Sequence, residues 1–218
     1  MGQDIHALSK ATPKGRVRRR KEARPGEIIS AGIAEFAEYG FERARLERIA
    51  AKAGISKGTI YLYFNSKEAL FSAAIEEHVL NVVAQNEAEI TGFEGTTEAL
   101  LRSILGRIYR KLLTPENTAL MRVLIAESGR VPGLAAKYHE MALGRGIAML
   151  KAIIERGVRR GEVVESIVSR QHELIVAPAI FLAVHNMVFS EFDEIDVEAF
   201  FESHVSLIVR GLCVECPG

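Results

Sequence analysis

The sequence predicts an all-α protein, with a short N-terminal group of helices followed by a longer helical domain. Apolar residues recur at helical spacing in almost every segment, and no stretch alternates convincingly like a β-strand. Breaks at Pro115, 129–133, Gly161 and 193–196 separate these segments. With 218 residues, the chain is long enough to bury a sizeable core in one domain or two.

Composition is that of a folded globular protein, with 48% hydrophobic and 26% charged residues and only 6 prolines. The longest apolar run, 174–184, is well short of the roughly 20 residues that a transmembrane helix needs. The first residues do not have the pattern of a secretory signal. We therefore expect a cytoplasmic protein with no membrane partner.

Charge is distributed unevenly along a chain whose formal net charge is zero. Residues 1–67 hold 14 Lys and Arg against 7 Asp and Glu, and the remainder is correspondingly acidic. Residues 1–24 are rich in Arg and Lys and have almost nothing to bury, so they are predicted to form a flexible basic arm. A basic end suits a polyanion, and such an arm either adds phosphate or minor-groove contacts or serves only as a solubilising tail.

Four helices are expected in the N-terminal part. The first begins at Pro25 and ends near Tyr39 with Gly40 as its stop. The second carries Leu46, Ile49, Ala50 and Ala53 on one face and ends at Gly54. Ser56 is the predicted N-cap of a third helix, and Asn65 with Glu68 resembles a capping box for a fourth helix, about 66–90.

The segment 46–64 has the geometry of a helix-turn-helix. Ala50 allows the helices to approach, Gly54 makes the turn, and Ile60 and Phe64 point inward. The outward face presents donors for phosphates and base edges in the major groove. These donors are Lys57, Thr59, Tyr61 and Tyr63.

The run 54–64, Gly-Ile-Ser-Lys-Gly-Thr-Ile-Tyr-Leu-Tyr-Phe, followed by Ser-Lys-Glu-Ala-Leu at 66–70, resembles the signature of the TetR family of regulators. The resemblance covers about residues 25–75. It implies that Gly58 allows close approach to a phosphate and that Leu62 occupies a variable position near a thymine methyl. It also implies that Lys67 clamps a phosphate and ties the DNA-binding head to the ligand domain.

One departure from the family pattern lies at the start of the second helix, where Ala44 and Arg45 stand in place of a common threonine cap. We expect the cap to be lost and Arg45 to supply a longer phosphate contact. The predicted DNA-binding domain is 25–70. Its expected contacts are Arg45, Ser56, Lys57, Gly58, Thr59, Tyr61, Leu62, Tyr63 and Lys67.

Residues 71–218 are expected to form a helical effector-binding and dimerisation domain. Its predicted helices are 97–112, 116–128, 133–160, 169–190 and 196–212. The segment 169–190 is apolar nearly all the way round, so it needs burial on two sides. The family layout implies that a second copy covers one of them, giving a homodimer that reads palindromic double-stranded DNA, although a central helix of a monomer is the alternative.

A small-molecule effector is expected mainly from the resemblance. The stretch 122–134, with Glu127, Arg130 and Pro132, resembles the sensor domain of some repressors of drug-efflux and lipid-metabolism genes, and we assign the chain to the multidrug-efflux-repressor type. A pocket for an apolar or amphipathic effector would be lined by aromatic, methionine and histidine side chains. The candidates are Phe93, Tyr109, Met121, Met141, Phe181 and His185.

Other functions have weaker support. The six histidines are scattered, and no spacing suggests a catalytic site, a metal site or a cofactor, so we predict no enzyme. Cys213 and Cys216 form a C-x-x-C that is either incidental or a thiol redox switch. The remaining alternative is a regulator of the same fold that responds to a protein partner or acts as an activator.

Overall fold

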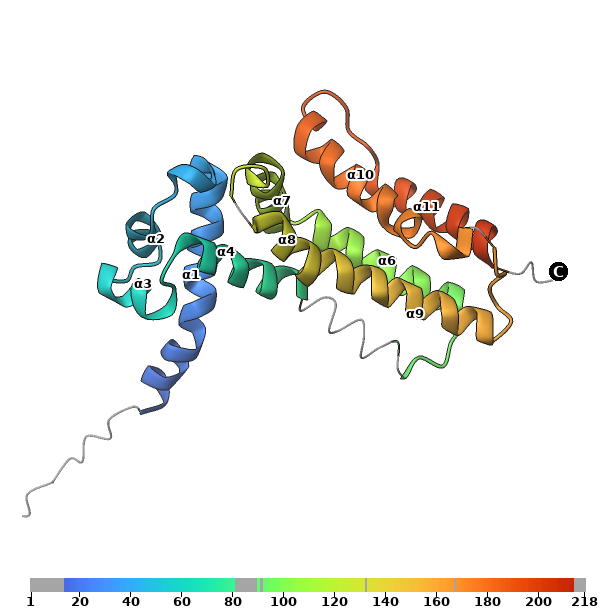
Figure 1. The fold of residues 1–218 in the computed structure, drawn as a ribbon, viewed down its shortest axis with the longest axis horizontal. Helices are drawn as coiled ribbons and strands as arrows, with labels where there is room; N and C mark the ends of the chain where they lie inside the picture. The colour runs from blue at the N-terminus through green and yellow to red at the C-terminus, as the bar shows by residue number, and fades with distance from the viewer. Residues whose placement is uncertain (1–13, 81–89, 91, 132, 167, 214–218) are drawn as a thin grey trace, which may run out of the picture.

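The computed structural model describes residues 14–80, 90, 92–131, 133–166 and 168–213. Every secondary-structure element in these ranges is a helix, which confirms the all-α fold. The described residues also contain one isolated antiparallel β-bridge, between Val163 and Cys213. Figure 1 shows α1, α2 and α3 grouped at one end, with α4 leading from them to the long helices of the larger domain.

The N-terminal group is built around three phenylalanines. Its elements are α1 (Lys14–Arg43), α2 (Leu46–Lys52), α3 (Lys57–Tyr63), α4 (Lys67–Ile75) and the π-helical η1 (Glu76–Leu80). The rings of Phe36, Phe41 and Phe71 meet pairwise with centroids 5.3–5.8 Å apart, and all three side chains are fully buried. These contacts join α1 to α4 and give the small domain a core of its own.

The first helix starts earlier than predicted. It begins at Lys14, so residues 14–24, which we expected in a flexible arm, are helical, and Pro25 lies inside the helix. The reason is that Arg, Lys, Ala and Glu are good helix formers even where they bury nothing. Residues 1–13 lie outside the described residues. The predicted break at Gly40 is present. Its φ of 74° is not helical and separates two helical segments of α1.

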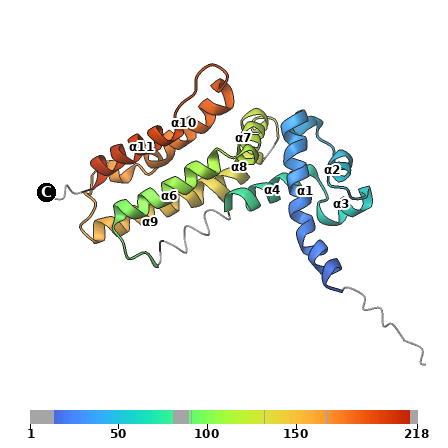
Figure 2. The same ribbon diagram turned by 180° about the vertical axis from the view of Figure 1, so that it is seen from behind.

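The larger domain consists of helices on both sides of α6. They are α6 (Thr97–Leu112), α7 (Pro115–Glu127), α8 (Leu134–Tyr138), the π-helical η2 (His139–Gly144), α9 (Arg145–Arg159), the 3-10 turn η3 (Val168–Arg170), α10 (Glu173–Phe189) and α11 (Val197–Leu212). The two opposite views in Figures 1 and 2 both show α6, α9, α10 and α11 running alongside one another. Leu101, Ile104, Ile153 and Val205 lie in the core between them, each at most 1% exposed.

Two other predicted helices differ in detail. The single helix expected over 133–160 is interrupted by the π-helical η2, which ends at Gly144, a residue that weakens the α-helical preference. The fourth helix is capped by the hydroxyl of Ser66, which accepts the amide of Ala69, and not by the predicted Asn65. It passes into η1 at Glu76, and 81–89 lie outside the described residues.

The two parts of the molecule share a continuous core. Leu120 and Val123 of α7 pack in the same buried cluster as the phenylalanines of the small domain. At the crossing of α1 and α4, a Cβ added to Gly32 would lie 2.6 Å from Leu70 Cδ2. The small domain is therefore held against the larger one through both α4 and α7.

Helix α10 buries one side only. Ile175, Ala179 and Leu182 face the core, whereas Phe181 is 56% exposed. The other exposed apolar side chains are Leu174, Val188 and Phe189 of α10 and Leu207 of α11. Within the described residues of one chain, the second side that the sequence predicted to need burial remains open.

Candidate DNA-binding surface and ligand cavity

The turn between α2 and α3 follows from three residues. Gly54 has a φ of 65°, a left-handed conformation that favours glycine, and the amide of Ile55 then donates to Ala50 O at 2.9 Å. Ser56 Oγ accepts the amide of Thr59 at 3.1 Å and caps α3. Ile60 is fully buried beneath the turn. The predicted helix-turn-helix geometry is therefore present.

The outer face of α3 is available to a large ligand. Leu62 is 84% exposed and Tyr61 44% exposed, and Lys57 also projects into solvent. Tyr63 is half-buried against the core, so its ring contributes to packing as well as to the surface. A Cβ on Gly58 would approach only Ser56 Oγ, at 3.9 Å, so packing within the chain does not require glycine there. A close phosphate at Gly58 remains a prediction.

A carboxylate that sequence reasoning missed lies on this face. Glu47 of α2 accepts from Lys57 Nζ at 2.9 Å and lies 3.4 Å from the hydroxyl of Tyr61. The hydrogen bond from Lys57 holds the pKa of Glu47 below its ordinary value, and the same contact raises the pKa of Lys57. Two of the predicted DNA contacts therefore share one acidic partner when DNA is absent.

Arg45 occupies the N-cap position of α2, with extended backbone angles and no side-chain cap hydrogen bond. The expected loss of the cap is thus observed. The side chain is exposed at the start of the helix, and its contact with a phosphate remains a prediction.

Lys67 joins the first residue of α4 to the end of α1. Its Nζ donates to Phe41 O at 2.9 Å and to Glu42 O at 2.8 Å, and lies 4.9 Å from the centroid of the Phe41 ring. The ammonium group is therefore already engaged with the backbone of the small domain. Its additional contact with a phosphate is untested.

A second ionic group fixes α2 against α1. Glu35 is fully buried and contacts Arg48 Nε at 2.5 Å and Lys52 Nζ at 3.0 Å. Lys52 also binds Glu38 at 2.6 Å, and Arg48 lies over the ring of Tyr39 at 4.3 Å. A buried carboxylate is costly without partners, so the contacts of Glu35 with Arg48 and Lys52 favour the packing of α2 against α1.

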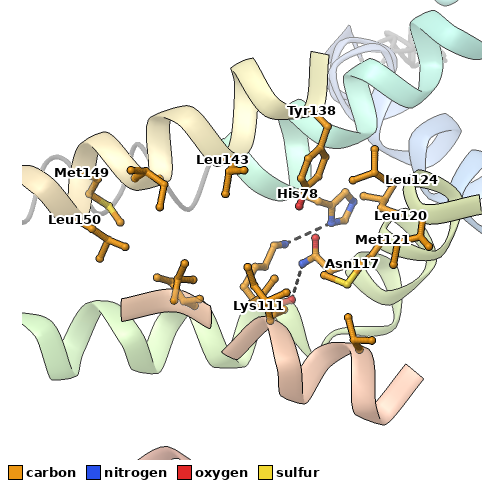
Figure 3. Close-up of a pocket in the computed structure, with 18 residues that line it drawn as sticks. His78, Lys111, Asn117, Leu120, Met121, Leu124, Tyr138, Leu143, Met149 and Leu150 are labelled. Carbon is orange, nitrogen blue, oxygen red and sulfur yellow. Dashed lines mark hydrogen bonds between the residues drawn. The ribbon is translucent and has the colours of Figure 1, made fainter. Parts of the chain in front are cut away.

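The larger domain contains an apolar cavity of about 330 Å³ between η1, α6, α7, α9 and α10. Most of its walls are aliphatic or methionine side chains. They include Ile108, Leu112, Leu120, Met121, Leu124, Ile125, Leu143, Ile147, Met149, Leu150, Val176, Ile180 and Val184. Figure 3 shows the polar group formed by His78, Lys111 and Asn117 amid these apolar walls.

Of the suggested effector residues whose side chains the structure describes, Met121 alone lines the cavity. Tyr109 is buried elsewhere, with its hydroxyl 2.9 Å from His204 Nδ1. Phe93 packs beside Arg156 at the far end of α6. The Met141 side chain, like Pro132, lies outside what the structure describes.

Phe181 and His185 do not line this cavity. It takes Val176, Ile180 and Val184 from α10, and Phe181 and His185 each follow one of these residues. Phe181 is exposed, whereas the His185 side chain is 11% exposed. Phe181 stacks on Phe200, and His185 lies 3.6 Å from Asp193. Because this helix is apolar on every side, its sequence did not indicate which face lines the cavity.

Cys213 is half-buried at the end of α11, and burial raises the pKa of its thiol. Reactive cysteines have a lowered pKa, so this environment disfavours the redox alternative. Cys216 lies outside the described residues. Those residues contain no group of three or more His, Cys, Asp or Glu arranged for a metal ion. None of their helices combines the length and the apolar character needed to span a bilayer.

Comparison with known proteins agrees with this architecture. Residues 28–74 match the family described as bacterial regulatory proteins of the tetR family, and residues 94–200 match the tetracyclin repressor-like C-terminal domain. The chain is 32% identical over 146 residues to the HTH-type transcriptional repressor SCO4008 of Streptomyces coelicolor, covering 67% of this chain and 70% of that one. The protein belongs to the TetR family. It is a DNA-binding transcriptional regulator and not an enzyme.

A second relative spans nearly the full length. The fatty acid metabolism regulator protein of Bacillus subtilis is 26% identical over 194 residues, covering 88% of this chain and 98% of that one. The structure of the regulator FadR from Bacillus subtilis in complex with stearoyl-CoA has a TM-score of 0.70 at 24% identity, covering 85% of this chain and 98% of that chain. The SmeT–triclosan complex has a TM-score of 0.74 at 21% identity, covering 88% and 93%.

Proposed function

We propose that this TetR-family regulator is a repressor that binds a palindromic operator as a homodimer and leaves it when a small amphipathic molecule enters the cavity. One observation carries the proposal. The cavity is lined in part by η1, and η1 continues α4, whose first residue is bonded to the end of α1. The ligand site and the DNA-binding head are therefore connected by one helical element.

The DNA end of the proposal rests on α3. Its outer face carries Lys57, Tyr61 and Leu62 at positions where such a helix reads base edges in the major groove. One seven-residue helix reads few base pairs, so specificity requires two heads separated by about 34 Å, one turn of DNA. Since its partner is chromosomal DNA, we place the protein in the bacterial cytoplasm.

The dimer rests on the exposed apolar surface of α10 and α11. Phe181, Val188 and Leu207 are each at least half exposed, and apolar side chains gathered on one face mark an interaction site. A second copy related by a two-fold axis presents the same surface, so the two sets of side chains cover one another. The arrangement leaves the cavity within each subunit.

The effector proposal rests on the walls of the cavity. A volume of about 330 Å³ lies near the lower end of the roughly 300–1,000 Å³ that is usual for small-molecule sites. The fatty acid regulator among the relatives, and the stearoyl-CoA in the FadR structure, favour the lipid-metabolism half of the expected resemblance. A cavity of this size with mainly apolar walls also favours a small molecule over a protein partner as the controlling ligand.

Release follows from linkage. A ligand shifts the position of the two heads only by its difference in affinity between the DNA-binding form and the released form. The affinity of a ligand that contacts both η1 and α10 depends on the position of α4. The hydrogen bonds from Lys67 transmit a displacement of α4 to α1.

The test is operator binding by fluorescence anisotropy, using the DNA that the protein protects around its own gene. Decanoate and triclosan serve as probes, and at least one is expected to release the wild-type complex. Leu150 is 1% exposed in the cavity wall, and Leu150→Trp is expected to retain operator affinity but lose the response. Val164→Trp, on an exposed segment, is the matched control. An unchanged response in Leu150→Trp contradicts the proposal.

A further inference from the structure

The cavity contains an incomplete hydrogen-bonding group. Lys111 Nζ, from the last turn of α6, lies 3.4 Å from His78 Nδ1 in η1. An ammonium group can only donate, so Nδ1 accepts and the hydrogen of the neutral ring is on Nε2. That Nε2 atom is buried and has no hydrogen-bond partner within the described part of the chain.

The imidazole is kept neutral by its surroundings. Burial lowers the pKa of His78, and the nearby charge of Lys111 lowers it further, against smaller opposite effects of Glu77 and Glu116. A neutral ring with its hydrogen on Nε2 is a donor aimed away from Lys111. The two donors therefore point in different directions, and the one on Lys111 carries a positive charge.

Neither donor meets an acidic side chain. Within the described residues, Lys111 has no ion-pair partner, although it is only partly exposed. Asn117 uses its amide nitrogen to donate to Lys111 O at 2.5 Å, which fixes the end of α6 beneath the ammonium. A donor in apolar surroundings without an acceptor is costly, and a bound anionic group would supply the acceptor that the ammonium lacks.

We propose that the effector is an amphipathic carboxylic acid, whose carboxylate is bound by Lys111 Nζ and whose apolar body lies along the aliphatic walls. This inference rests on the proposed function. Figure 3 shows Lys111 and His78 directed toward each other between α6 and η1, with Met149 and Leu150 to one side and Leu120 and Leu124 to the other.

The size of the cavity narrows the class further. At about 330 Å³ it suits a single medium-length chain and does not have room for such a chain and a nucleotide together. A coenzyme A thioester has no carboxylate where the acid has one, and its nucleotide would have to remain outside. The polar group therefore distinguishes a free acid from the corresponding thioester and alcohol.

The experiment compares decanoate, 1-decanol and decanoyl-CoA by isothermal titration of the full-length protein at neutral pH. A charge-assisted hydrogen bond from the ammonium of Lys111 predicts that decanoate binds about 10- to 100-fold more tightly than 1-decanol. Lys111→Met is expected to remove this preference while leaving 1-decanol binding unchanged, and Lys111→Arg to retain it. Lys137→Met, on the exposed surface of α8, is the matched control and is expected to behave as wild type.

Three results would overturn the inference: no binding of decanoate to the wild type, equal affinity for 1-decanol, or equal weakening of both ligands by Lys111→Met. The comparison of acid with alcohol needs no variant, so it decides the matter even if Lys111→Met does not fold. Failure of the broader proposal has a different signature. If decanoate binds with the expected preference but no ligand releases the operator, the site stands and the control of DNA binding does not.

Discussion

The contact of Lys67 with the end of α1 offers a quantitative test of how α4 holds the DNA-binding head. Lys67→Met keeps an unbranched side chain over Phe41 but removes both hydrogen bonds from the ammonium. The bond to Phe41 O is partly buried, whereas the bond to Glu42 O is exposed and water replaces it readily. Only the first is expected to count fully, for about 1.5–3 kcal/mol.

The assay is urea unfolding at a fixed protein concentration, since a dimer would make stability depend on concentration. The expected loss corresponds to a decrease in melting temperature of roughly 3–12 °C for a chain of this size. Operator affinity is expected to decrease with stability, because the small domain is less firmly oriented. Lys137→Met again serves as the control.

An unfolding free energy within about 0.5 kcal/mol of the wild type would refute this reasoning, because surface substitutions commonly have effects of that size. It would mean that water satisfies both carbonyl groups as well as Lys67 does. A lower operator affinity without loss of stability would instead support the untested phosphate contact of Lys67.

Three further predictions concern charge. Glu47→Gln releases Lys57 and removes an acidic group from the recognition face, so affinity for unrelated DNA is expected to increase, with a steeper dependence on salt in anisotropy titrations; unchanged affinity would contradict this. Hydrogen bonds from Thr97 and then Arg160 lower the pKa of Glu162 to about 2, so its stabilising effect is present above pH 4.5 and is lost as the pH falls toward 2. Glu162→Gln should therefore reduce stability at pH 7 by about 1–3 kcal/mol and much less near pH 2, as urea unfolding would show. Burial lowers the pKa of His204, so the unfolded chain takes up protons first, and stability is expected to decrease as the pH falls below about 6.5. His204→Phe should make that decrease smaller in thermal melts between pH 7 and 5. A pH dependence of stability identical to that of the wild type would contradict the prediction.

Local chemistry made the helix-turn-helix predictable. The left-handed turn at Gly54, the cap at Ser56 and the buried Ile60 are each determined by residues close in sequence. The same holds for the break at Gly40. Where a helix is set by its own charged residues, as in 14–24, a reading based on burial placed the boundary too late.

The cavity was less predictable because it depends on which helix faces meet. On α6 the lining residues are Ile108, Lys111 and Leu112, while the predicted Tyr109 points to another part of the core. His78 and Lys111 are 33 positions apart, and neither stands out in a sequence where polar residues usually face solvent. Their contact is a tertiary feature that periodicity alone does not reveal.

The two helices α1 and α4 are closely packed where they cross at Gly32. Leu70 fills the space that any side chain at that position would need, so α4 cannot settle closer to α1 when η1 moves. Close-packed interiors deform little, and a displacement of α4 therefore either carries α1 with it or separates the two helices. Because Gly32 has no side chain, α1 and α4 pack closely enough for α4 to transmit a displacement to α1 without absorbing it.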